Sequence, residues 1–143
     1  MDSNEDFSKL YTCGFGGKVG IINLSEGDIK GSIELNKSSF NMGISLINEN
    51  CLVVGNQSGE IYTLNENLNS NGVSFCFSSG IRNINCLPDK SKILITLENS
   101  RISLLDLVKE QAIELKQFEG HSDTITGIAT LDDEMRFFSW FYN

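Results

Sequence analysis

The chain has one histidine, His121, which Ser122 and Asp123 follow directly. These three residue types carry out acyl transfer when a histidine base activates a serine and an acid from elsewhere in the fold orients the histidine. Neighbouring residues in one turn do not converge in that way. A zinc site needs several ligands, and the sequence offers no second histidine as a companion. We therefore interpret His121 as a structural residue and predict that the protein is not an enzyme.

Carboxylates occur close together at residues 132–134 and at Glu26 with Asp28. Both groups fall in predicted turns, where acidic side chains accept hydrogen bonds from the backbone and remain hydrated. A calcium site needs several oxygens in a spacing that neither group has. The glycine-rich run at residues 14–17 lacks the Gly-Lys-Ser/Thr ending and the helix of a phosphate-binding loop, so we interpret it as a hairpin turn. The sequence therefore predicts no metal and no other cofactor.

The four cysteines have no spacing typical of a metal site, and each lies in a predicted strand. They are Cys13, Cys51, Cys76 and Cys86. We interpret them as small, reduced residues in or near the core of an intracellular protein. The N-terminus is acidic and polar and lacks the basic flank and the apolar stretch of a secretory signal. These observations favour a cytoplasmic protein, with the nucleus as an alternative.

The composition is that of a folded, acidic protein. Of the 143 residues, 40% are hydrophobic, and the formal net charge is −8. A chain of this length can bury a substantial core. The negative charge disfavours binding to the phosphates of nucleic acids, because no basic run offsets it. No apolar stretch is long enough to cross a bilayer, so we expect neither nucleic-acid binding nor membrane insertion.

The strands that would position these residues recur at a regular interval. An apolar residue followed by Asn or Asp marks a predicted strand at Ile22, Leu64 and Leu105, which are 42 and 41 residues apart. A turn of small or amide residues precedes each of these strands, as a tight hairpin requires. An interval of roughly 40–45 residues is typical of propeller blades that have four strands each. We therefore predict an all-β fold of four-stranded antiparallel units.

Near the C-terminus, Gly120 and His121 precede an alternating strand, a polar corner and a second strand that reaches Trp140. Through this order and the regular interval, residues 9–140 resemble the WD-repeat family. The resemblance implies blades of a β-propeller, in which a histidine, a serine or threonine, an aspartate and a tryptophan form a buried hydrogen-bonded set. His121 and Ser139 match two of these roles by position. In the other units the aspartate is replaced by Gly16, Ser58 and Asn99.

These signals divide the chain into a leader and four units. Residues 1–8 are interpreted as a flexible acidic leader. The strands define a partial blade of three strands at 9–35, blades at 36–78 and 79–118, and a partial blade of two strands at 119–143. The segment 108–118 also fits a short helix, but its position in the repeat favours a strand. The expected fold is thus an incomplete or open ring of four-stranded antiparallel β-propeller blades.

An open ring leaves the faces of its first and last units uncovered. Closure of the ring is what shields the faces and edges of propeller blades, and large apolar faces left in water drive association. Two explanations therefore stand side by side. Either the chain is a fragment of a longer propeller, or copies of it associate through the open faces.

The resemblance places partner contacts on one rim of the ring. In the family, this rim is built by the loops that enter each blade and by the hairpins between its second and third strands. By position, the rim residues are Phe15, Ser39, Gln57, Gly80, Glu98, Ser122 and Thr124. We expect them to be exposed and to contact partners, with Phe15 either an anchor for a partner or packed against a neighbouring loop. We predict a non-catalytic scaffold for protein partners; the alternative is a regulatory or substrate-recruiting part of a larger enzyme or signalling protein.

Overall fold

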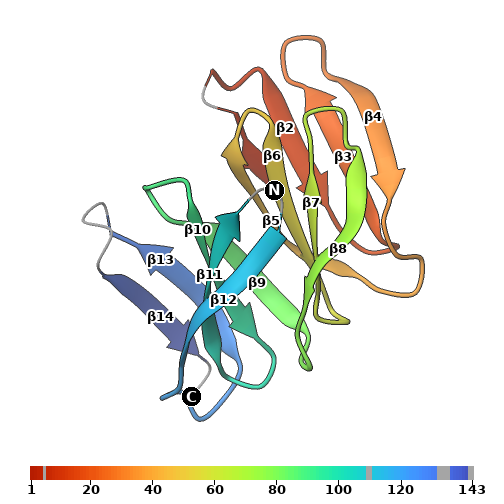
Figure 1. Cartoon of the computed structure of the whole chain (residues 1–143). Coiled ribbons are helices and arrows are strands. Elements are labelled where there is room, and N and C mark those ends of the chain that lie inside the picture. The colour runs from red at the N-terminus through yellow and green to blue at the C-terminus, as the bar shows by residue number, and fades with distance from the viewer. Residues whose placement is uncertain (5, 109–110, 132–135, 142–143) are drawn as a thin grey trace.

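The computed structural model describes residues 1–4, 6–108, 111–131 and 136–141, and strands joined by turns make up its fold (Figure 1). The strands are β1 (Asp2–Ser3), β2 (Lys9–Cys13), β3 (Lys18–Asn23), β4 (Asp28–Glu34), β5 (Asn41–Asn48), β6 (Cys51–Asn56), β7 (Glu60–Leu64), β8 (Ser70–Cys76), β9 (Ile81–Cys86), β10 (Lys92–Leu97), β11 (Ile102–Val108), β12 (Gln111–Phe118), β13 (Ile125–Thr130) and β14 (Phe137–Phe141). These described ranges contain no helix, and so none that is long and apolar enough to cross a membrane. The predicted all-β fold is confirmed.

The strands form four antiparallel sheets, each with its strands in chain order. We call β1–β4 the first sheet, β5–β8 the second, β9–β12 the third and β13–β14 the last. The four-stranded antiparallel units that the repeat predicts are therefore present. The segment for which a helix was the alternative is confirmed as a strand over Gln111–Phe118, where β12 pairs with β11.

The first sheet has four strands, so the prediction of three strands for this unit was wrong. Its additional strand, β1, has only two residues, which pair with Tyr11 and Leu10 of β2. Asp2 also reaches beyond its own sheet, because its Oδ2 accepts a hydrogen bond of 2.8 Å from the backbone N–H of Leu46 in β5. Residues 2–3 of the predicted leader thus belong to the folded unit. Two polar residues carry no apolar alternation that would indicate a strand.

Side chains at alternate positions of the central strands fill separate cores between neighbouring sheets. In β6, Leu52 and Val54 belong to the core shared with the first sheet, whereas Val53 belongs to the core shared with the third. In β10, Ile95 packs toward the second sheet and Leu94 toward the last. Because successive side chains of a strand point to opposite faces, the second and third sheets are covered on both faces.

The sheets stand side by side, with their first strands in contact. β5 lies against β1 and β9, and β9 lies against β13. Glycine permits a close approach here, since a Cβ on Gly55 would come within 2.8 Å of side-chain carbons of Ile81 and Ile84. In Figure 1 the first and last sheets lie at opposite ends of the molecule, with the other two between them. In the described part of the chain, the two end sheets therefore have a neighbouring sheet on one face only.

The cysteines lie within strands, as predicted. Cys13, Cys51 and Cys86 are half-buried, and burial raises the pKa of the Cys86 thiol to about 11, which keeps it protonated and unreactive. Cys76, at the end of β8, is exposed, so its prediction as a near-core residue was wrong.

Two buried threonines give a matched test of hydrogen bonding in the core. Thr96 is fully buried, and its hydroxyl has no hydrogen-bond partner in the described ranges. Thr63 is also buried, but its hydroxyl oxygen is 2.8 Å from that of Ser74. An unpaired buried hydroxyl costs about 1–3 kcal/mol. We expect Thr96→Val to leave the free energy of unfolding unchanged or raise it by about 1 kcal/mol, and Thr63→Val to lower it by about 1 kcal/mol.

Urea denaturation of both variants beside the wild type measures these changes. Because both substitutions replace a hydroxyl with a methyl group of similar size, the difference between them isolates the hydrogen bond. A larger loss of stability in Thr96→Val than in Thr63→Val would contradict the assignment of Thr96 as unpaired.

Candidate functional site

The turns at one end of the sheets follow one another in a series that we call the rim. The rim consists of residues 14–17, 35–40, 56–59, 77–80, 98–101 and 119–124. Hairpins between the second and third strands of a sheet alternate in it with loops that lead to the next sheet. In Figure 1 these turns follow the lower margin of the molecule. All the predicted partner-contact residues lie in these segments.

Hydrogen bonds and an ion pair tie each turn of the rim to the next. The hydrogen bonds run from Leu35 N–H to Gly17 O (3.0 Å), from Gln57 N–H to Phe40 O (2.9 Å), from Phe77 N–H to Gly59 O (2.9 Å) and from Glu98 N–H to Gly80 O (2.8 Å). The ion pair joins the last hairpin to the last loop, with 2.9 Å between Nη2 of Arg101 and Oε1 of Glu119. Since backbone groups make most of these links, the rim has a defined shape before any partner binds.

The predicted partner-contact residues differ in exposure. Phe15, Gln57 and Ser122 are exposed, whereas Glu98 and Thr124 are half-buried. Ser39 and Gly80 are buried, so the expectation that they are exposed was wrong. The hydroxyl of Ser39 accepts a hydrogen bond of 3.0 Å from Ser58 N–H. A Cβ on Gly80 would lie 2.5 Å from the carbonyl oxygen of Gln57 and 2.8 Å from the carboxyl group of Glu98. These two residues hold neighbouring turns together.

Phe15 forms an aromatic pair with Phe40 at one end of the rim. The ring centroids are 4.8 Å apart and the planes meet at 79°, the edge-to-face arrangement that aromatic rings favour. Phe15 is nevertheless 79% exposed, and Phe40 is 43% exposed. The packing alternative for Phe15 is therefore confirmed, since its ring packs on the neighbouring loop. Most of the ring still lies in solvent, and its role as an anchor for a partner stays a prediction.

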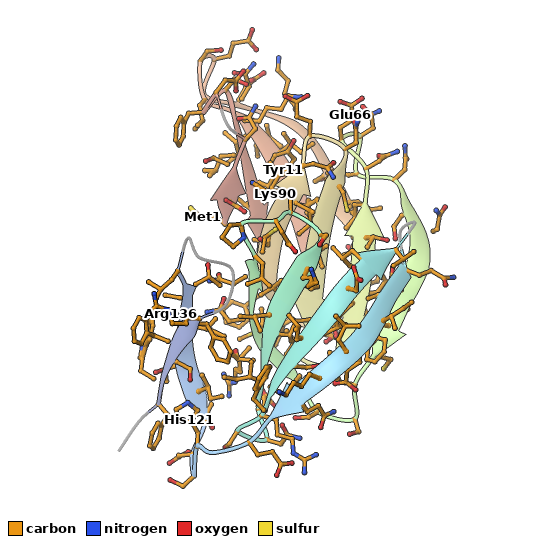
Figure 2. The ribbon with its side chains drawn as sticks, turned by 60° about the vertical axis from the view of Figure 1, so that its left-hand side comes forward. Met1, Tyr11, Glu66, Lys90, His121 and Arg136 are labelled. Atoms are coloured by element: carbon orange, nitrogen blue, oxygen red, sulfur yellow. The ribbon has the colours of Figure 1, made fainter. Side chains whose placement is uncertain are left out.

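His121 lies at the rim end of the last sheet (Figure 2). Its Nε2 is 2.5 Å from the hydroxyl oxygen of Ser139 in β14, and its ring packs on that of Phe141 with centroids 4.7 Å apart. Asp123 accepts a hydrogen bond of 2.6 Å from the backbone N–H that follows it, so its carboxylate closes the turn. The two residues matched by the resemblance therefore meet, next to the exposed Gly120, in a contact that holds the loop to the strand.

A second polar cluster surrounds Glu60, and the sequence did not predict it. Oε2 of Glu60 accepts hydrogen bonds from Asn36 Nδ2 (2.8 Å), Asn56 Nδ2 (2.7 Å) and the Tyr62 hydroxyl (2.9 Å). The buried Asn56 also accepts bonds of 3.0 Å from the backbone N–H groups of Ser58 and Glu60. The cluster thereby joins the loop at residues 35–40 to the hairpin at 56–59. Asn36 is 24 residues from Glu60 in the sequence, and only the asparagines beside predicted turns could have suggested that it joins the cluster.

The cluster fixes the protonation of its members. Hydrogen bonds from Asn36 and then from Asn56 favour the carboxylate and lower the pKa of Glu60 below its ordinary value, against a smaller opposite effect of burial. Burial, followed by the hydrogen bond to Glu60, raises the pKa of Tyr62 to about 12. A neutral phenol and an ionised carboxylate at neutral pH suit a structural role, since a general acid or base has a pKa near the working pH.

Glu60→Gln should lower the free energy of unfolding at neutral pH by about 1–2 kcal/mol, because hydrogen bonds to a charged acceptor are stronger than those to a neutral one. A carboxyl group with a lowered folded pKa stabilises the protein above its unfolded pKa, and that stabilisation is lost as the pH falls through the folded pKa. The advantage of the wild type over the variant should therefore shrink below about pH 4.3, the ordinary pKa of Glu.

Urea denaturation over a series of pH values measures this difference, with Glu66→Gln as the matched control because Glu66 is exposed. The control should show little difference from the wild type at any pH. An advantage over Glu60→Gln that is constant from neutral pH into the acid range would contradict the role of the Glu60 carboxylate.

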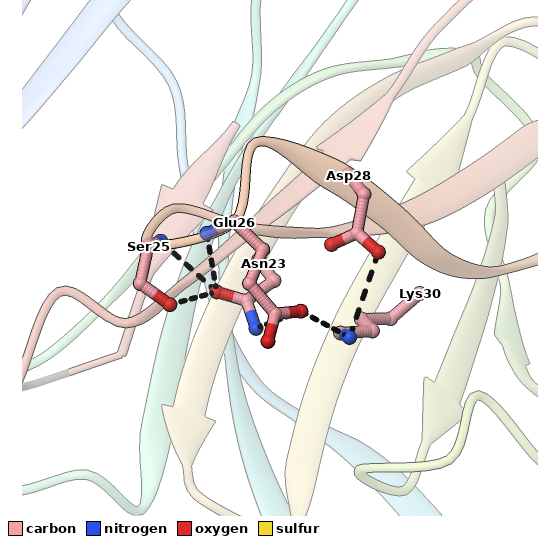
Figure 3. Close-up of polar contacts among 5 residues, drawn as sticks. All are labelled: Asn23, Ser25, Glu26, Asp28 and Lys30. Carbon is pink, nitrogen blue, oxygen red and sulfur yellow. Dashed lines mark hydrogen bonds and ion pairs between the residues drawn. The ribbon is translucent and has the colours of Figure 1, made fainter.

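Glu26 lies in an exposed turn of the first sheet, and Asp28 directly after that turn begins β4 (Figure 3). Lys30 forms ion pairs with both, at 3.5 Å from Asp28 Oδ2, and the side chain of Asn23 caps the same turn. These carboxylates are thus paired within a solvated turn. The other predicted acidic turn, 132–134, lies outside the described residues. Within the described ranges, no group of three His, Cys, Asp or Glu side chains could hold a metal ion.

The comparisons with known proteins do not assign the chain to a family. No protein-family model and no curated protein matches its sequence. Its function is therefore inferred from the geometry of the rim and from the resemblance of its repeats.

Proposed function

We propose that the protein is a non-catalytic scaffold, part of a WD-repeat propeller, that binds protein partners through its rim. The observation that carries this proposal is the exposed pair of Phe15 and Phe40 on turns that are tied to one another. An aromatic ring left in water at a hairpin tip adds little to folding. Aromatic side chains are also enriched at the centres of protein interfaces, where few residues supply most of the binding energy.

The rest of the rim suits a partner that is a folded protein or a peptide. Gln57 and Ser122 are exposed and offer hydrogen-bonding groups on either side of the centre of the rim. Because the turns are linked, binding orders few groups and loses little conformational entropy. The net charge of −8 favours partners with basic surfaces.

The polar clusters support a scaffold over an enzyme. The His121 and Ser139 pair holds a loop to a strand, and the carboxylate of Glu60 accepts its hydrogen bonds from groups of the rim itself. Neither cluster joins a nucleophile and a base to a third orienting group within the described residues.

A pair of phenylalanine variants tests the proposal. Phe7 is the matched control, because it is 71% exposed but lies in the turn between β1 and β2, at the end of the first sheet away from the rim. The full chain, fused to a biotin ligase, would be expressed in cells as the wild type, as Phe15→Ser and as Phe7→Ser. Loss of a central interface aromatic costs about 2 kcal/mol or more, so labelling of a true partner should fall at least about tenfold in Phe15→Ser.

The same partners should be labelled equally by the wild type and by Phe7→Ser. Circular dichroism and thermal denaturation of the purified variants would show that both are folded, and the binding of each partner would then be measured with purified proteins. Partners that bind all three chains equally, or that lose binding equally in both variants, would contradict a rim centred on Phe15.

A further inference from the structure

The last sheet has an aromatic face that nothing in the described part of the chain covers. Ile128 and Phe137 point into the core shared with the third sheet, so the neighbouring residues of β14, Phe138 and Trp140, point to the opposite face. They are 63% and 52% exposed. The indole of Trp140 lies beside Gly127 of β13, where a Cβ would come within 2.1 Å of the ring. Two large, partly exposed rings therefore cover this face, with the indole lying over Gly127.

The first sheet has the opposite shape at the other end of the molecule. Tyr11 and Val19 point into the core shared with the second sheet, so the residues next to them in β2 and β3 point outward. A hollow on this outward side is lined by Thr12, Gly20, Ile22, Ile29 and Ser32, and Phe15 and Lys18 border it at the rim end. Its floor is thus small or aliphatic, which leaves room for large side chains of another surface.

We propose that these two faces bind one another between two copies of the chain, the aromatic face of one last sheet packing into the hollow of the other copy's first sheet. The first three sheets already pack in this way, each with one face on the sheet that follows it in the chain. Tyr11 is the internal precedent, because it lies in β2, the second strand of the first sheet, and is 2% exposed in the core with the second sheet. Trp140 and Phe138 lie in β14, the second strand of the last sheet.

Two copies are enough to cover the open face of the first sheet and the open face of the last sheet in each copy. A head-to-tail contact between identical chains forms a ring where its rotation closes and a filament where it does not. Each copy brings four sheets, so two copies bring eight, and β-propellers close with about four to eight blades. The complex is therefore a two-fold dimer with two equal contacts, each of which covers two rings that otherwise stand in water.

Light scattering after size exclusion, carried out on the full chain, tests the dimer through its mass, which should be twice 15.9 kDa. Trp140 is the sole tryptophan, so fluorescence reports on the contact itself. Dilution should dissociate the dimer, shift the emission to longer wavelength and increase quenching by iodide. A monomeric wild type with a concentration-independent, quenchable tryptophan would overturn the proposal; the open faces would then be covered by other chain segments or by another protein.

Three lysine variants show which faces meet. Phe138→Lys changes the aromatic face and keeps the reporter, Ile22→Lys changes the hollow, and Ile113→Lys is the control because Ile113 is 52% exposed on the outer strand β12. The first two should be monomers and the third a dimer. If circular dichroism shows that Ile22→Lys is unfolded, Ile29→Lys replaces it, since Ile29 is 73% exposed.

A mixture of Phe138→Lys and Ile22→Lys gives the sharpest result. The first variant keeps an intact hollow and the second an intact aromatic face, so the mixture should form a one-to-one dimer through one contact, weaker than the wild-type dimer. Association of two aromatic faces predicts a different pattern, in which the hollow variants remain dimers and only Phe138→Lys is a monomer. That pattern, or polydisperse aggregates of the wild type, would overturn the head-to-tail arrangement.

Discussion

Replacement of Gly59 by alanine should destabilise the protein far more than the same replacement at Gly16. Both glycines lie in rim hairpins and have positive φ values, +86° and +88°. A residue with a Cβ costs about 1–2 kcal/mol in this left-handed region, and this cost is common to both sites. At Gly59 the new Cβ would also lie 2.4 Å from the carbonyl oxygen of Phe77 and 2.7 Å from that of Ser79. At Gly16 no atom lies within 4 Å of it.

The hairpin at residues 56–59 must therefore move away from the loop at 77–80 in Gly59→Ala. We expect a loss of about 3 kcal/mol or more in the free energy of unfolding, against about 1–2 kcal/mol for Gly16→Ala. Urea denaturation gives both values. Equal losses at the two positions would mean that the hairpin and the loop are not in contact, and the linked rim would then be wrong.

A second large loss is expected for Ile95→Ala. Ile95 is fully buried in β10, in the core that the second and third sheets share. Removal of such a side chain costs about 2–5 kcal/mol, from lost burial and from the cavity that remains. Ile113→Ala is the matched control, because Ile113 is 52% exposed on β12 and should change stability by about 0.5 kcal/mol or less.

Thermal and urea denaturation measure the difference between these two isoleucine variants. It also tests the packing of the sheets, since Ile95 is buried only if the second sheet lies against the third. A small effect of Ile95→Ala, similar to that of Ile113→Ala, would contradict the arrangement of the sheets.

The strands and their order could be predicted because their signals are local. Ile22, Leu64 and Leu105 mark the third strands of the first three sheets, β3, β7 and β11, at the predicted interval. Turn residues and alternating apolar residues lie within a few positions of one another, and each sheet pairs strands that are consecutive in the chain. The resemblance located the rim, and its segments could be assigned because they follow the order of hairpins and loops.

The features that the sequence did not predict depend on contacts between distant segments. Strand β1 is two polar residues, one of which is held by a hydrogen bond to Leu46 of another sheet. Ser39 and Gly80 are buried because neighbouring turns close over them. The Glu60 cluster joins residues from a loop, a strand end and a hairpin. Such convergence has no local pattern, so it becomes visible only in the folded chain.

The shapes of the two end faces were unpredictable in the same sense. The strand count indicated that both faces are open, but not that one is hollow and the other carries exposed aromatic rings. That difference depends on which residues of β14 alternate outward and on the position of Gly127 beside Trp140.

Amide hydrogen exchange, followed residue by residue by NMR, tests the central claim that the rim is formed before a partner binds. The amides of Gln57, Phe77 and Glu98 lie in turns, yet each donates to a neighbouring rim segment at 2.8–2.9 Å. They should exchange orders of magnitude more slowly than in an unfolded peptide, closer to the amides of the buried strand β6. Exchange of these three amides at unfolded-peptide rates, while β6 remains protected, would contradict the claim and would mean that a partner must order the rim as it binds.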